Sequence, residues 1–342
     1  MTRPRLLSPS RILRSTIRAP GGGRRRDPLV EKSRKAIEQG SKSFRAASRL
    51  FDRVTRERIW MLYAWCRRCD DLADGQRMGR PAEGDAASPE EIATRVKGIR
   101  ILTQAALDGQ PTADVAFDAF GQVASECGLT YRDAEEVIAG FELDAKDWRP
   151  RTQDDLMRYC YHVAGAVGVM AALVMGVRRD DGEALDSACD LGIAFQLSNI
   201  ARDLLEDDAA GRCYLPIEWL VEEDIEPGQH TKPHHRQELA DMAARLITLM
   251  ELHEAHARVG TARLRFRQRW AVLSAARIYG AIGREVRRLG TEAWNHRVYT
   301  SRWHKLYHAQ AAFWEALVNR PPSPPALPRW TRARLAENIA AA

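Results

Sequence analysis

The chain alternates between stretches in which apolar residues recur every three to four positions and short polar connections. Apolar residues at that spacing lie on one face of an α-helix, so each stretch predicts an amphipathic helix. The predicted helices cover residues 29–40, 56–74, 185–207, 236–258 and 269–289. No stretch combines sustained apolar–polar alternation with a hairpin turn, so no β-sheet is expected. The pattern predicts an all-α protein with a single helical domain.

Three short motifs mark the starts of further helices. Ser88–Glu91 places a serine before a proline and a glutamate three positions after the serine, which is a typical cap for the start of a helix. Thr130–Asp133 and Thr152–Asp155 repeat the arrangement with threonine and aspartate. We therefore expect helices to begin at these three places.

The most apolar segment covers residues 159–177, which are 19 residues without formal charge. That length is compatible with a membrane span. Charged residues adjoin the segment at both ends, and its glycines, Gly165, Gly168 and Gly176, favour close contact between helices. We expect a buried central helix here, with a membrane span as the alternative.

The positive charge of the chain is concentrated at its N-terminus. The 342 residues carry a net charge of +6, but residues 1–26 hold eight arginines and no acid, which leaves −2 for the rest. A body without excess positive charge argues against a nucleic-acid-binding protein. We expect a disordered basic arm at 1–28, an all-α domain at 29–312 and a Pro-rich C-terminal tail at 313–342.

Residue types that often bind metals are expected to be structural or solvated at two places. Cys66 and Cys69 form a single CxxC pair with no second pair to complete a zinc or redox site, so they are expected to be structural. His253 and His256 lie on a polar segment without a carboxylate cage and are expected to be solvated. Six scattered cysteines are typical of a reducing compartment, so a cytoplasmic protein is expected.

The first pattern with chemical meaning lies in residues 63–74. On a helix, Tyr63, Arg67, the pair Asp70 and Asp71, and Asp74 form one stripe. Carboxylates one turn apart destabilise an isolated helix, and a bound cation reverses that effect. Carboxylate oxygens are ligands that Mg²⁺ prefers. The alternative is a solvated acidic helix end.

A second stripe consists of Asn199, Asp203 and Asp207, which are each four residues apart. Arg202 adjoins this stripe, and Gln196 precedes it as a site residue or as a satisfied core amide. Two such stripes facing each other across a helical bundle would hold several Mg²⁺ ions and a diphosphate.

Six ordered motifs resemble the squalene/phytoene synthase family, most of all its bacterial phytoene synthases. The motifs are residues 41–44, 63–74, 159–165, 199–207, 211–216 and 299–302. The resemblance covers roughly residues 30–310. It implies an isoprenoid-synthase helical bundle around a central cavity. It also implies head-to-head condensation of two geranylgeranyl diphosphates, through prephytoene diphosphate, to phytoene, the first committed step of carotenoid biosynthesis.

The resemblance also implies roles for individual residues. The implied metal ligands are Asp70, Asp74, Asn199, Asp203 and Asp207. The implied substrate-binding residues are Ser41, Lys42, Ser43, Phe44, Gln196, Arg202 and Arg302. The implied catalytic residues are Tyr63, Arg67, Asp71 and Tyr159, the two tyrosines orienting the diphosphate or taking part in the final proton loss.

The implied cofactor is Mg²⁺ or Mn²⁺, and no NADPH is expected. The expected partners are geranylgeranyl diphosphate and a membrane surface bound peripherally through the arginine-rich arm, with no nucleic acid and a monomeric protein. One alternative is a squalene or dehydrosqualene synthase that uses farnesyl diphosphate. A non-enzymatic alternative is a helical scaffold that binds polyanions through its basic arm.

Overall fold

The computed structural model describes residues 18–40, 42–73, 76–77, 80–81, 89–145, 148–320, 323 and 330–336. For residues 42, 43, 76, 77, 80, 81, 89 and 145 it describes the backbone alone. Two predicted site residues, Ser41 and Asp74, therefore lie outside the described residues, as do the side chains of Lys42 and Ser43.

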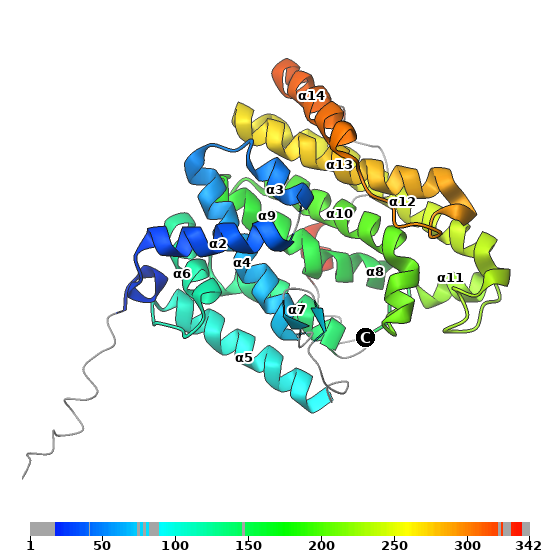
Figure 1. The fold of residues 1–342 in the computed structure, drawn as a ribbon, viewed down its shortest axis with the longest axis horizontal. Coiled ribbons are helices and arrows are strands. Elements are labelled where there is room, and N and C mark those ends of the chain that lie inside the picture. The colour runs from blue at the N-terminus through cyan, green and yellow to red at the C-terminus, as the bar shows by residue number, and fades with distance from the viewer. Residues whose placement is uncertain are drawn as a thin grey trace, which may run out of the picture.

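The described chain is almost entirely helical (Figure 1). The α-helices are α2 (Arg26–Gly40), α3 (Lys42–Ser48), α4 (Arg53–Ala73), α5 (Pro89–Leu107), α6 (Val115–Cys127), α7 (Tyr131–Ala145), α8 (Gln153–Cys160), α9 (Ala166–Val174), α10 (Gly182–Ala209), α11 (Ile217–Glu222), α12 (Arg236–Gly260), α13 (Phe266–Leu289), α14 (Arg302–Val318) and α15 (Arg332–Leu335). A π-helical turn, η2 (Tyr161–Gly165), joins α8 to α9, and 3₁₀ turns occur at η1 (Pro20–Gly23), η3 (Pro233–His235), η4 (Thr261–Arg263) and η5 (Gly290–Glu292). Two two-residue strands, β1 (Gln76–Arg77) and β2 (Arg80–Pro81), pair antiparallel.

The helices predicted from apolar periodicity are present, and four of the five begin three residues before the predicted start. The periodicity starts only at the first inward side chain, whereas the helix begins with a polar turn. The predicted caps on α7 and α8 are confirmed: the backbone N–H of Asp155 donates to the Thr152 hydroxyl over 3.2 Å, and that of Thr130 to the Asp133 carboxylate over 2.7 Å. Ser88 lies outside the described residues.

Helix α10 runs through the middle of the molecule, and α12 and α13 lie along one side of it (Figure 1). Its crossing with η2 and α9 depends on glycines. A Cβ atom on Gly192 would come within 2.2 Å of the Ala164 carbonyl oxygen, and one on Gly168 within 2.2 Å of that of Ala188. Gly165 is similarly close to Cys189. The two backbones therefore touch, as the glycine pattern predicts.

The apolar segment forms the core helix that the sequence favours. One helical run, Gln153–Val174, is long and apolar enough to span a membrane, and 61% of its most apolar window is buried within the protein. Gly176, which was expected to contribute to helix contact, instead ends the segment with a φ of +92°, a conformation that glycine favours.

The prediction that residues 1–28 form a disordered arm is wrong for residues 18–28. Residues 18–28 are described and include η1 and the start of α2. Arg24 pairs with the fully buried Asp118 over 2.6 Å, and Arg26 pairs with Glu57 and with Glu126. Buried carboxylates thus hold this part of the arginine-rich segment on the domain, which the composition alone did not indicate. Residues 1–17 lie outside the described residues.

The predicted boundary between domain and tail at 312/313 falls inside a helix, because α14 continues to Val318. Beyond it, the Trp330 indole N–H donates to Asp154 over 2.9 Å, and Leu335 is buried. The end of the described chain therefore packs on α8 and α10.

Candidate active site

The first predicted stripe lies on α4 and is organised around Arg67. Its guanidinium pairs with Asp70 over 2.9 Å and with Asp71 over 2.7 Å. Asp71 is buried, whereas the Asp70 side chain is 41% exposed. The Nε atom of Arg67 is buried and has no hydrogen-bond partner among the described residues. An unpaired buried N–H is costly, so this edge of the guanidinium is suited to an oxyanion. Asp71 lies on the other side and holds Arg67 in place.

Tyr63 connects this stripe to the motif at residues 41–44. Its ring stacks on Phe44 with centroids 5.5 Å apart. A Cβ atom on Gly40 would lie 2.1 Å from the Tyr63 hydroxyl, so that hydroxyl sits at the end of α2, one residue before Ser41. Burial raises the pKa of the Tyr63 phenol to about 12, so it remains a hydrogen-bond donor at neutral pH.

The second stripe lies on the last turns of α10, where two arginines hold Asp203. Arg202 forms a two-pronged pair with it, and Arg297, from the segment before α14, donates to it over 3.0 Å and pairs with Glu206 over 3.3 Å. Burial opposes ionisation of Asp203, but the hydrogen bonds and charges of its partners prevail and lower its pKa. Asp203 is therefore a carboxylate at neutral pH.

Asp207, one turn further along α10, has the opposite behaviour. Burial, together with the charges of Asp203, Glu206 and Asp144, raises its pKa from 3.8 to about 7, and Arg212 offsets only part of this. A carboxyl group surrounded by other carboxylates becomes ionised readily when a cation joins the cluster.

Asp144, from α7, organises the tyrosines beside this cluster. The hydroxyls of Tyr159 and Tyr214 both donate to the same Asp144 oxygen, over 2.9 and 3.0 Å. The two rings stack with centroids 4.8 Å apart, and Trp148 stacks on the far side of Tyr159. Burial raises the pKa of Tyr159 well above its usual range, so this phenol stays protonated. Asp144 was not predicted from the sequence, because nothing in the α7 periodicity distinguishes it.

The type of helix changes two residues after Tyr159, where η2 begins. The turn η2 is π-helical, and π-turns inside helices are frequent at functional sites. The extra residue in the turn accompanies a buried histidine, His162, whose Nδ1 lies 2.9 Å from the Glu136 carbonyl oxygen. The motif at residues 159–165 therefore coincides with a local change in helix geometry.

Tyr279, on α13, packs against α10 near the second stripe. Its ring stacks on Phe195 of α10 with centroids 4.3 Å apart. It acts electrostatically on both Tyr63 of α4 and Arg202 of α10. Tyr279 therefore packs on α10 just before the second stripe and lies near Tyr63 of the first. Tyr279 was not predicted from the sequence, because it lies within an ordinary amphipathic pattern.

Three of the predicted site residues are half-buried or exposed. Asn199 and Gln196 are half-buried on α10, in the stretch that leads to Asp203. Arg302 is exposed at the first position of α14, and Arg297 rather than Arg302 meets the α10 carboxylates in the described structure. Arg297 is five residues before the predicted residue, and its segment shows no regular pattern that could have identified it.

The residues present fit a divalent cation on the α10 side. No group of three His, Cys, Asp or Glu side chains within reach of a common metal ion occurs among the described residues, which do not include Asp74. The raised pKa of Asp207, caused by burial and by neighbouring carboxylates, nevertheless marks a place where positive charge is favoured. Carboxylate and amide oxygens form the donor set that Mg²⁺ and Mn²⁺ prefer.

The cysteines and histidines away from this site are structural. Cys69 is buried and Cys66 is half-buried, and both are free thiols. The expectation that His253 and His256 are solvated is wrong, because both are buried. His253 Nδ1 lies 2.7 Å from an Asp190 oxygen, so a polar pair inside the interface between α12 and α10 explains a polar residue at a core position.

Comparison with known proteins identifies the family of the chain. A model of the squalene/phytoene synthase family matches residues 37–304. The chain belongs to the squalene/phytoene synthase family. It is 44% identical over 285 residues to a phytoene synthase of Pseudescherichia vulneris, covering 83% of this chain and 91% of that protein. It is 41% identical over 309 residues to a 15-cis-phytoene synthase of Pantoea ananas, covering 89% and 98%.

Solved structures of this family share the fold. A dehydrosqualene synthase in complex with a ligand superposes with a TM-score of 0.72 at 23% identity, over 84% of this chain and 96% of that one. A squalene synthase from Alicyclobacillus acidocaldarius gives a TM-score of 0.66 at 21% identity, over 80% and 98%. The predicted family, the all-α isoprenoid-synthase fold in one domain and an enzyme of prenyl-diphosphate chemistry are thereby confirmed.

Proposed function

We propose that the protein is a phytoene synthase that joins two molecules of geranylgeranyl diphosphate head to head, through prephytoene diphosphate, to phytoene. The observation that carries the proposal is an identity of 41–44% with bacterial phytoene synthases over 83% or more of the chain. The polar cluster on α4, α7 and α10 supplies what the chemistry requires.

The barrier in this reaction is heterolysis of an allylic carbon–oxygen bond, which leaves a carbocation and a diphosphate anion. Arg67 has an unpaired buried Nε atom and is proposed to hold diphosphate oxygens. Arg202 is proposed to do the same from α10. Tyr63 stays protonated, so it is proposed to orient the diphosphate as a hydrogen-bond donor. The Tyr159 hydroxyl already donates to Asp144, so Tyr159 is proposed to take part in the final proton loss instead.

A divalent cation, Mg²⁺ or Mn²⁺, is proposed as the cofactor. Asp203 and Asp207, with Asn199, would hold it on the α10 side, and Asp70 and Asp74 on the other side. When bound, it neutralises the leaving diphosphate as a Lewis acid. Each half of the reaction ends in loss of a proton rather than gain of a hydride, so no NADPH is needed.

The second candidate is dehydrosqualene or squalene synthesis from farnesyl diphosphate. It is favoured by the fold comparison, in which a dehydrosqualene synthase gives the TM-score of 0.72. The same polar cluster would serve either substrate, since both carry an allylic diphosphate. The length of the product decides between the two candidates.

We further propose that the protein is cytoplasmic, monomeric and peripheral to a membrane. Its proposed substrate and product are long hydrocarbons that partition into lipid. No part of the proposed reaction requires nucleic acid. A polyanion-binding scaffold would leave the carboxylate cluster around Asp207 without a role.

Release of diphosphate from geranylgeranyl diphosphate tests the assignment of the site. Wild-type protein should release it only with Mg²⁺ or Mn²⁺, and chelation with EDTA should abolish the release. Asp203→Asn should lower the rate by about 100-fold or more, because a neutral amide is a weak partner for both metal and arginine. Asp241→Asn, at an exposed position on α12, is the matched control and should keep the wild-type rate. Wild-type turnover in Asp203→Asn would contradict the assignment.

A further inference from the structure

Helix α14 carries an apolar face that no described part of the chain covers. Seven of the ten exposed large apolar side chains among the described residues lie within residues 299–318. They are Tyr299, Trp303, Leu306, Tyr307, Trp314, Leu317 and Val318. At 100° per residue, the six of them that lie on the helix fall within an arc of about 120°. The other three, Val54, Ile101 and Val221, are scattered singly.

The opposite side of α14 is firmly packed, so this exposure is not fraying. Ala312 and Ala316 are fully buried with Leu273 of α13. Phe313 makes an edge contact with Trp270 at 5.3 Å, and the Trp270 indole N–H donates to the Ala309 carbonyl oxygen over 2.8 Å. Helix α14 lies on the outer side of α13 (Figure 1), and these contacts fix which face it turns outward.

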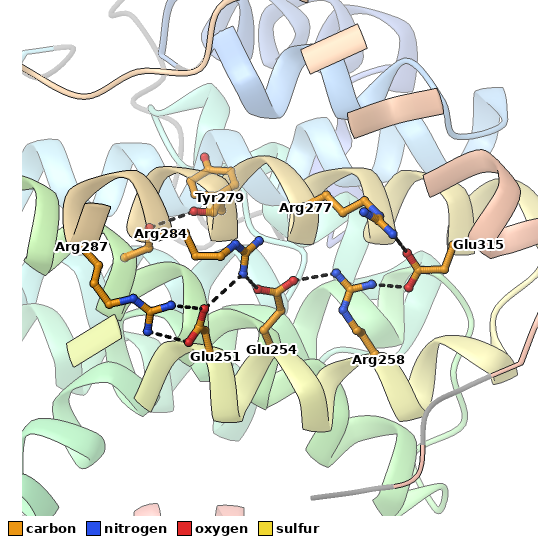
Figure 2. A network of polar contacts seen from close by, with 9 residues as sticks. Glu251, Glu254, Arg258, Arg277, Tyr279, Arg284, Arg287 and Glu315 are labelled. Atoms are coloured by element: carbon orange, nitrogen blue, oxygen red, sulfur yellow. Dashed lines mark hydrogen bonds and ion pairs between the residues drawn. The ribbon is translucent and has the colours of Figure 1, made fainter. Parts of the chain in front are cut away.

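The exposed charged side chains of α14 itself and of the residues just beyond its end are basic. The single acid of α14, Glu315, is turned inward, where it pairs with Arg258 of α12 and with Arg277 of α13 over 2.7 Å (Figure 2). Arg302 and His304 are exposed near the start of the helix, and Arg320 is exposed just beyond its end. The face is therefore apolar, rich in tryptophan and tyrosine, and bordered by basic side chains at both ends.

We propose that this α14 face is the surface that docks on an anionic lipid bilayer. Tryptophan and tyrosine prefer the membrane interface, and basic side chains beside them are attracted to anionic headgroups. A second copy of the chain fits the face less well. Because both ends of the helix are basic, either orientation of two such helices brings like charges together.

The position of the face agrees with the proposed function, on which this further step rests. Arg297 pairs with Asp203 and Glu206 in the carboxylate cluster, and α14 begins five residues later. Five residues span at most about 17 Å, so the start of the docking face lies near the diphosphate site. Docking would hold the site beside the lipid in which a C20 substrate dissolves.

Co-sedimentation with vesicles tests the docking surface without any substrate. The full chain is mixed with phosphatidylcholine vesicles that contain 0 or about 30% phosphatidylglycerol, an anionic fraction that gives a substantial surface potential. The double variant Trp303→Ser/Trp314→Ser should bind the anionic vesicles about tenfold or more weakly than wild type, because two interfacial aromatic side chains are lost. The double variant Ile101→Ser/Val221→Ser removes comparably exposed apolar residues elsewhere (60% and 71%, against 79% and 58%) and should bind within about twofold of wild type.

Three results would overturn the proposal. The first is that the tryptophan variant binds the anionic vesicles like wild type. The second is that deletion of residues 1–17 alone abolishes binding. The third is that wild type sediments as a dimer and the tryptophan variant as a monomer. The last result would make the face an interface between copies. Turnover in detergent is measured separately and should stay at the wild-type rate in the tryptophan variant. A loss of vesicle binding is thereby distinguished from a failure of the proposed enzymatic function.

Discussion

Among single residues, two aspartates of the site have the same chemistry but different surroundings. Asp203 and Asp207 are one turn apart on α10, yet arginines lower the pKa of the first, while burial and neighbouring carboxylates raise that of the second to about 7. Asp203 is thus ion-paired within the protein, whereas the surroundings of Asp207 favour an added cation. The spacing of the stripe predicted that the two share a face, but the difference between them comes mainly from the pairing of Asp203 with Arg202 and from the burial of Asp207, to which Arg297 and Asp144 add from other segments.

Asp207 predicts a pH dependence of the metal-free protein. Its pKa is higher when folded than its ordinary value of 3.8, so the folded state binds the extra proton between about pH 4 and pH 7. The free energy of unfolding should therefore fall as the pH rises through that window, with Asp207 contributing on the order of 4 kcal/mol. Urea unfolding in EDTA should show a flatter profile for Asp207→Asn than for wild type. Addition of Mg²⁺ at pH 7.5 should stabilise wild type alone, and identical profiles for the two proteins would contradict this.

Asp144 is predicted to act by positioning Tyr159 and Tyr214, since one of its oxygens accepts from both hydroxyls. Asp144→Asn keeps the shape but weakens these bonds, because a charged acceptor is roughly twice as strong as a neutral one. We expect kcat to fall by about tenfold while KM changes less than about twofold. A change in thermal stability with unchanged kcat would show that Asp144 is structural only.

At the scale of the elements, glycines set how closely α9 and α10 approach. The backbone carbonyl of Ala164 occupies the space that a side chain on Gly192 would need. Gly192→Ala should therefore lower the free energy of unfolding by about 1–3 kcal/mol, as overpacked cores do. Gly98→Ala on α5 meets no atom within 4 Å and should be neutral or raise it by about 0.5–1 kcal/mol, because alanine favours helix. Equal effects of the two substitutions on urea unfolding would contradict this view of the crossing.

The elements were largely predictable from the sequence, whereas the contacts between them were not. Apolar periodicity located α10 and α13, and Thr152 marked the start of α8, because these signals are local. Asp144, Tyr279 and Arg297 reach the site from α7, α13 and the segment before α14. Their importance arises only when those segments pack around α10. The buried pair of His253 and Asp190 was missed for the same reason.

At the scale of the whole molecule, the net charge of +6 describes no single surface. Arg24 and Arg26 form ion pairs with carboxylates of the domain, which neutralise part of the N-terminal positive charge. Acidic side chains gather near the end of α10, and the apolar face with basic ends lies on α14. The proposed diphosphate site and the proposed lipid-docking surface thus lie close together in one helical domain.

Whether this domain condenses C20 diphosphates is decided by identifying its product. Purified protein is incubated with Mg²⁺ and an equimolar mixture of farnesyl and geranylgeranyl diphosphates, without NADPH, and the hydrocarbons are identified by mass spectrometry. The account predicts phytoene, a C40 hydrocarbon, as the main product. A C30 hydrocarbon as the main product, or no hydrocarbon at all, would contradict it.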